Sequence, residues 1–165
     1  MNRMMRVVPA ALAFALVIAV SAPALVASAA DTTPMTMDQL KDAVKKGKKQ
    51  LVADNMTLTA GEEAAFWPIY EAYQVDLDKI NERTKKAILA YADAYNAGPI
   101  GDAQAKSLLD ETISIEGDLV KMREGYKKKL VKAIPPAKAA RYMQIESKIR
   151  AVINYEIADA VPLAQ

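Results

Sequence analysis

Apolar residues recur at helical spacing through most of the chain after residue 30. Two runs, from Phe66 to Tyr91 and from Leu108 to Tyr126, advance by alternating steps of four and three residues. This spacing places the side chains on one stripe of a helix, whereas a half-buried strand would alternate with period two. The pattern predicts an all-α protein with long, coiled-coil-like helices. The two stripes consist of Phe66, Tyr70, Tyr73, Leu77, Ile80, Thr84, Ala87 and Tyr91, and of Leu108, Thr112, Ile115, Leu119, Met122 and Tyr126.

Four helix starts are visible as local signals. Thr36 and Thr59 each have a glutamine or glutamate three residues later, which is the spacing of a capping box. The segment 96–101 is rich in Asn, Gly and Pro, and Asp102 after it is a good N-cap. Pro136 suits a first helical turn, where its missing N–H would be unpaired anyway. Four helices are therefore expected to begin near these four positions.

The two longest predicted helices should form an antiparallel hairpin. At 1.5 Å per residue, a helix from Thr59 to Asn96 spans about 55 Å, and the return helix from Asp102 to Ala133 is almost as long. Pro68 lies inside the first of them and is expected to bend it; the alternative is a helix that begins late. Such a hairpin is thin and exposes much surface, so we expect it to form a homodimer.

The N-terminus has the pattern of a signal peptide. Residues 1–6 contain two arginines, residues 7–20 are almost wholly apolar, and Ala27-Ser28-Ala29 offers a cleavage site. We expect residues 1–30 to be removed after Ala29 or Ala30, which leaves 31–165 as a single helical domain. The alternative is an uncleaved anchor, because residues 7–30 carry no charge and could cross a bilayer of roughly 30 Å. Pro23 and the alanine-rich tail argue against the anchor.

Composition narrows the chemistry. Without residues 1–30, the chain has 20 Lys and Arg and 20 Asp and Glu, so net charge gives no indication of nucleic-acid binding. The chain contains no Cys and no His. These two residue types are the usual zinc ligands, and His is also the usual general base near neutral pH. No cofactor, metal site or enzymatic activity is predicted. Met35 and Met37 offer two thioethers of the kind that bind Cu(I), but a copper site usually needs more ligands.

The two halves of the helical region have similar starts. A shift of 76 residues places Leu58 on Ile134, Glu62 on Lys138 and Phe66 on Tyr142. Two amphipathic helices of the same period could match in this way by chance.

The repeated segments resemble a known family. Leu58-Thr59-Ala60-Gly61-Glu62 is similar to the LTxxQ motif of periplasmic proteins of the Spy/CpxP type, and the segment 134–142 is similar to its second copy. Glu62 and Lys138 stand where the family has glutamine, and Pro135 where it has threonine. The motif residues are Leu58, Thr59, Glu62, Ile134, Pro135 and Lys138.

The resemblance implies a periplasmic, four-helix protomer that dimerises into a curved cradle. Members of this family bind unfolded proteins without ATP or restrain an envelope stress sensor. Candidates for a client-binding or dimer surface are Phe66, Trp67, Tyr70 and Tyr73, although core packing is the stronger reading for all but Trp67. The alternatives are an interaction module with one envelope partner, and a metal sensor or buffer, against which the lack of His and Cys argues.

Overall fold

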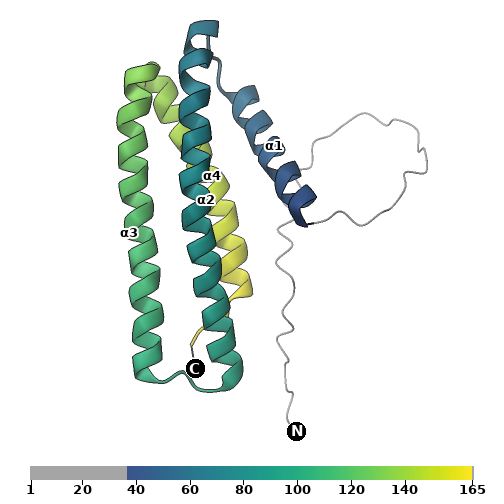
Figure 1. Cartoon of the computed structure of the whole chain (residues 1–165), viewed down its shortest axis with the longest axis vertical. Coiled ribbons are helices and arrows are strands. Elements are labelled where there is room, and N and C mark those ends of the chain that lie inside the picture. The colour runs from purple at the N-terminus through teal and green to yellow at the C-terminus, as the bar shows by residue number, and fades with distance from the viewer. Residues whose placement is uncertain (1–36, 165) are drawn as a thin grey trace, which may run out of the picture. The chain divides into compact units, whose positions relative to one another are not determined.

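The computed structural model describes residues 37–164, and their side chains from residue 46 onward (Figure 1). The described residues fall into two compact units, the first ending at Asp54 and the second beginning at Asn55. The first unit contains most of α1 (Met37–Asn55). The predicted signal peptide lies outside the described residues, as do Thr36 and Met35. None of the described helices is long and apolar enough to cross a membrane.

The all-α prediction is confirmed for the described residues, which form four helices and no strand. The second unit contains α2 (Ala60–Ala97), α3 (Asp102–Ala133) and α4 (Pro136–Ala160). At 1.5 Å per residue, the 38 residues of α2 extend for about 57 Å. That residues 31–165 form a single domain stays a prediction.

Local signals fix the helix ends in the second unit. Thr59 caps α2 as predicted, and α4 begins at Pro136. Gly98 follows α2 with φ of 129°, a conformation that glycine adopts without steric cost. The prediction of Asp102 as N-cap was one residue late, because Gly101 has the extended N-cap conformation and Asp102 is the first helical residue. There, its carboxylate lies in the first turn, where the helix dipole favours negative charge.

Helices α2 and α3 lie side by side and run in opposite directions (Figure 1). Tyr126 on α3 bonds to Asp76 on α2, and the earlier residue Asp118 bonds to the later residue Arg83. The degree of burial varies along the predicted stripes. The stripe of α2 is fully buried from Phe66 to Tyr73, and half-buried from there to Tyr91. The core is therefore concentrated at the end of the unit where α4 also packs.

Pro68 lies in the middle of continuous helix. Because α2 runs unbroken from Ala60 with its capping box in place, the alternative of a late helix start is wrong. Pro68 has no N–H to donate toward the carbonyl of Ala64, and its ring crowds that carbonyl. The side chain is exposed, so the ring is placed on the solvent side of the helix.

Candidate functional site

The two motif copies meet at the start of α2 and α4. Glu62 accepts a hydrogen bond from the backbone N–H of Thr59 at 2.7 Å, and the Thr59 hydroxyl accepts one from the Glu62 N–H at 3.4 Å. Lys138 Nζ donates to the same Glu62 oxygen at 2.6 Å. The hydrogen bond from Lys138, followed by that from Thr59, lowers the pKa of Glu62. This carboxylate thus joins the first turns of two helices.

The remaining motif residues belong to the same helix ends. Ile134 is buried and its N–H donates to the carbonyl of Leu130 at 2.9 Å, which closes the end of α3. Pro135 is exposed and serves as the N-cap of α4, and Leu58 is half-buried. All six motif residues thus sit at helix ends, where they set the geometry of the bundle.

Three of the four aromatic candidates are core residues. Phe66, Tyr70 and Tyr73 are at most 2% exposed, and their rings contact Tyr142 of α4 with centroids 5.1 to 6.0 Å apart. These three residues therefore do not form an exposed client-binding or dimer surface, because α4 covers the face that they occupy. Trp67 is half-exposed at the edge of this cluster and packs against the ring of Phe66 at 5.1 Å.

A polar group beside these rings was missed by the sequence reasoning. Glu146 of α4 is 2% exposed and accepts a hydrogen bond from Gln74 Nε2 of α2 at 2.9 Å. Gln74 Nε2 also lies 3.3 Å from the hydroxyl of Tyr142. Glu146 continues the buried run of Ala139 and Tyr142 at steps of three and four. A glutamate on an apolar helix stripe is the signal that could have indicated it.

Burial changes the titration of the groups around Glu146. Burial, and next the nearby charge of Glu146, raises the pKa of Tyr73 to about 12, and the same two causes raise the pKa of Tyr70 and Tyr142. Burial, followed by repulsion from Arg123, lowers the pKa of Arg150. The tyrosines therefore stay neutral at physiological pH, and their phenolate forms are not available as nucleophiles or bases.

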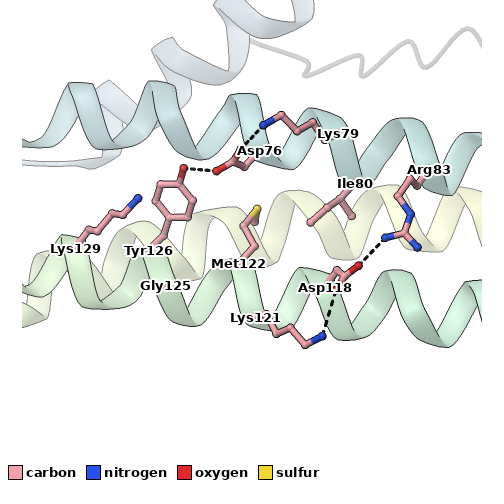
Figure 2. Close-up of a pocket in the computed structure, with 10 residues that line it drawn as sticks. All are labelled: Asp76, Lys79, Ile80, Arg83, Asp118, Lys121, Met122, Gly125, Tyr126 and Lys129. Atoms are coloured by element: carbon pink, nitrogen blue, oxygen red, sulfur yellow. Dashed lines mark hydrogen bonds and ion pairs between the residues drawn. The ribbon is translucent and has the colours of Figure 1, made fainter.

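A groove of about 410 Å³ between α2 and α3 is lined by a network of charged side chains (Figure 2). Tyr126 donates to Asp76 at 2.6 Å, and Lys79 donates to the same carboxylate at 2.8 Å. The ammonium of Lys129 lies 4.3 Å from the centre of the Tyr126 ring. The residues that line this α2–α3 groove are Asp76, Lys79, Ile80, Arg83, Asp118, Lys121, Met122, Gly125, Tyr126 and Lys129.

Arg83 forms the ion pairs at the other end of the α2–α3 groove. Its guanidinium donates to Asp118 at 2.6 Å and, through two nitrogens, to Glu111 at 3.0 and 3.1 Å. The hydrogen bond from Arg83, followed by that from Lys121, lowers the pKa of Asp118. The carboxylates of this groove are ionised and paired with cations, so at neutral pH they have no proton to donate. The groove is an interhelical ion-pair network.

The outer face of α3 exposes a line of large apolar side chains. Leu109, Ile113, Val120 and Val131 are between 43% and 61% exposed. They follow one another at steps of 4, 7 and 11 residues, which keeps them within about 40° of each other around the helix. We call these four residues the α3 stripe.

The α3 stripe continues into a second groove, between α3 and α4, of about 440 Å³. Arg123, Glu124 and Lys127 are the charged residues along it, and the rest of the lining is apolar. We call it the α3–α4 groove; its apolar lining is Val120, Val131, Pro136, Ala139, Ala140 and Met143. Sequence reasoning from the buried stripes could not indicate it, because its walls come from two helices and because Val120 and Val131 lie outside the predicted stripe of α3.

Within the described part of the chain, no three Asp or Glu side chains come together as a metal-binding group. The side chain of Met37 lies outside the residues whose side chains are described. Compared with known protein families, curated proteins and solved structures, the chain matches none of them. No comparison therefore identifies a family, and the similarity to Spy/CpxP-type proteins stays a prediction from the sequence.

Proposed function

We propose that this chain is an exported, non-enzymatic protein that binds apolar segments of other proteins without ATP, in the manner of a chaperone. The single observation that carries the proposal is the α3 stripe. Apolar side chains of this size usually gain on the order of 1 to 3 kcal/mol each when they move from water into an apolar contact. A line of four such side chains on one helix face is typical of an interaction surface.

The surroundings of the stripe support weak and reversible binding. Asp110 and Glu116 lie near its start, and Lys121 and Lys127 lie further along α3. Charged residues around an apolar surface keep the free protein soluble and add electrostatic attraction that depends on salt. A client held in this way can detach and refold without the input of energy that an ATPase supplies.

Location and assembly belong to the same proposal. The signal pattern of residues 1–30 supports export, and the motif similarity supports the periplasm. Half-buried residues at the α2–α3 end, such as Ala87, Tyr91 and Leu108, support a dimer in which a second copy covers them. Sedimentation equilibrium of the purified chain at about 1 to 100 μM tests the dimer, because a dimer with a dissociation constant of about 1 μM is mostly assembled at the upper concentration and partly dissociated at the lower one.

An aggregation assay tests the binding activity. The purified chain is expected to slow the aggregation of a chemically denatured test protein at near-stoichiometric amounts. Replacing Leu109, Ile113 and Val120 together by serine should abolish the effect. The matched control replaces Val75 and Val152 by serine, since both are about as exposed (57% and 49%) but lie on α2 and α4. If the control variant loses as much activity as the α3 variant, the stripe is not the binding surface.

The alternative is an interaction module with one dedicated envelope partner. The defined shape of the α3–α4 groove favours this alternative, because a groove accepts fewer ligands than an open stripe does. Capture of a single envelope protein by the chain, with no effect on aggregation, would replace the chaperone proposal by this one.

A further inference from the structure

Basic residues are concentrated in one part of the second unit. Residues 121–150 contain ten Lys and Arg but only two acidic residues, Glu124 and the buried Glu146. Residues 57–78 of the chain show the opposite bias, with five acidic residues and no basic one. The two segments lie together, since Lys138 bonds to Glu62 and Tyr126 bonds to Asp76. One side of the basic segment is thus already matched by an acidic helix, α2.

The side that carries the α3–α4 groove has no such match. Lys127 lines the groove, Lys128 and Lys132 follow it as exposed residues of α3, and none of these three lysines has a carboxylate within ion-pair distance in the described part of the chain. The groove between these helices is apolar in most of its lining. An apolar groove bordered by unneutralised cations is complementary to an apolar ridge bordered by carboxylates.

We infer that the α3–α4 groove binds an acidic amphipathic helix of a partner protein. The groove spans α3 from Val120 to Val131, about 16 Å or three helical turns, and the α3 stripe prolongs it to Leu109, about 33 Å in all. A helix of this length presents apolar residues at i, i+4, i+7 and i+11 to such a groove. The inference rests on the proposed function, which is protein binding through this face. It adds that the bound segment is helical and acidic.

The charge along α3 also gives the bound helix a direction. Residues 102–118 contain five acidic residues and one lysine, whereas the lysines cluster after residue 120. The carboxylates of the partner should therefore lie over the Val131 end. The floor of the groove is recessed, since Ala139 is 2% exposed and Met143 is half-buried, whereas Val120 and Val131 are 55% and 43% exposed. A recessed floor beside projecting valines fits the ridge of a helix.

Fluorescence anisotropy with synthetic peptides tests the inference on the purified full chain. The probe is a labelled 21-residue helical peptide with leucine at every a and d position of the heptad and glutamate at the flanking positions. A second peptide has lysine in place of each glutamate, and a third keeps the glutamates but has serine in place of each leucine. The acidic leucine peptide should bind at least about tenfold more tightly than either relative, which corresponds to about 1.4 kcal/mol. Its binding should weaken as salt rises.

Two single variants locate the site. Ala140→Glu places a carboxylate in the groove, and Lys127→Glu reverses the charge at its edge; each should weaken binding of the acidic peptide at least about tenfold, or about 1.4 kcal/mol. Ala90→Glu and Lys86→Glu make the same changes at exposed positions of α2 that do not line the groove. These controls should change binding by less than about twofold, within the range of long-range charge effects. Circular dichroism of all four variants checks that the helices are retained.

Three results would overturn the inference. One is equal binding of the acidic and basic peptides; if the chain also slows aggregation, the proposed function survives and only the ligand chemistry is wrong. Another is an equal loss for groove and control variants. The third is displacement of the peptide by vesicles of anionic phospholipid but not of neutral phospholipid, which would assign the groove to a membrane surface. Absence of both peptide binding and aggregation suppression would reject the proposed function as well.

Discussion

Lys138 Nζ lies 2.6 Å from Glu62 Oε2, and the two residues are 76 positions apart in the sequence. The same shift relates Phe66 to Tyr142, whose ring centroids are 5.1 Å apart. Positions that are equivalent in the internal repeat thus contact each other. The starts of α2 and α4 are held together by an ion pair at their first turns and by aromatic rings that meet edge to face one turn further along.

This ion pair gives a pH-dependent prediction. Since the pKa of Glu62 is lowered in the fold, the stability that it contributes is present above its unfolded pKa of about 4.3 and is lost as pH falls through the folded value. We expect Glu62→Gln to be less stable than the parent at pH 7, by a difference that shrinks as pH falls below about 4.3. Urea denaturation at a series of pH values measures this difference.

The neighbouring carboxylate is the control. Glu63→Gln removes the same charge from the same first turn, but Glu63 is exposed and is not part of the capping box. Its effect should be small at every pH. A stability difference between Glu62→Gln and the parent that does not shrink as pH falls would show that the ion pair is not its source.

Two buried tyrosine hydroxyl groups are expected to have opposite effects on stability when each is removed. The hydroxyl of Tyr73 is buried and has no hydrogen-bond partner among the described residues, whereas that of Tyr142 lies 3.3 Å from Gln74 Nε2. An unpaired buried polar group is unfavourable, so Tyr73→Phe should leave stability unchanged or raise it. Tyr142→Phe should lower it by about 1 kcal/mol. Each variant is the control for the other in chemical denaturation, and a larger loss for Tyr73→Phe would contradict the assignment.

Glu146 gives a third prediction. Replacing it by leucine removes the acceptor that Gln74 Nε2 meets at 2.9 Å, in a site that excludes water, and should reduce stability by about 1 to 3 kcal/mol. Glu146→Gln keeps an oxygen at the same position and should lose less. Thermal and urea unfolding distinguish the two. If the leucine variant proves as stable as the parent, Glu146 does not hold α2 and α4 together.

The helix starts were predictable because they depend on neighbours in the sequence. Thr59 and Glu62 lie three residues apart and cap α2 by themselves, and Pro136 requires no distant contact to begin α4. The burial of Phe66, Tyr70 and Tyr73 does not depend on their neighbours in the sequence. Whether a helix stripe is covered depends on the path of a later helix, and only the return of α4 onto α2 decides it.

The candidate binding surface was the least predictable part. The α3 stripe has steps of 4, 7 and 11, so that it does not appear in a search for continuous steps of three and four. The α3–α4 groove joins Val120 and Met143, which are 23 residues apart, and its existence depends on the direction in which α4 leaves Pro135. Glu146 is the exception, because a charged residue within an apolar stripe is visible in the sequence.

Tyr126 provides a prediction about a single carboxylate. Hydrogen bonds from Lys79, and next from Tyr126, lower the pKa of Asp76, while burial, followed by Asp76, raises the pKa of Tyr126 to about 12. Tyr126→Phe should therefore move the pKa of Asp76 upward, toward its usual value near 3.9. Carboxyl carbon shifts in an NMR titration measure it. Tyr155→Phe, at a tyrosine that is 70% exposed, is the control and should leave Asp76 unchanged.

Pro68 yields the last prediction, since a proline in a helix interior usually costs about 3 kcal/mol through the lost hydrogen bond and the ring contact with the preceding turn. Because Pro68 is exposed, Pro68→Ala should raise stability by up to about 3 kcal/mol. It should also slow amide hydrogen exchange near Ala64. Pro136→Ala is the matched control, because proline in a first turn loses no hydrogen bond, and should give little gain. A Pro68→Ala variant that is less stable than the parent would mean that the bend expected near Ala64 is required for α2 to pack on α3 and α4.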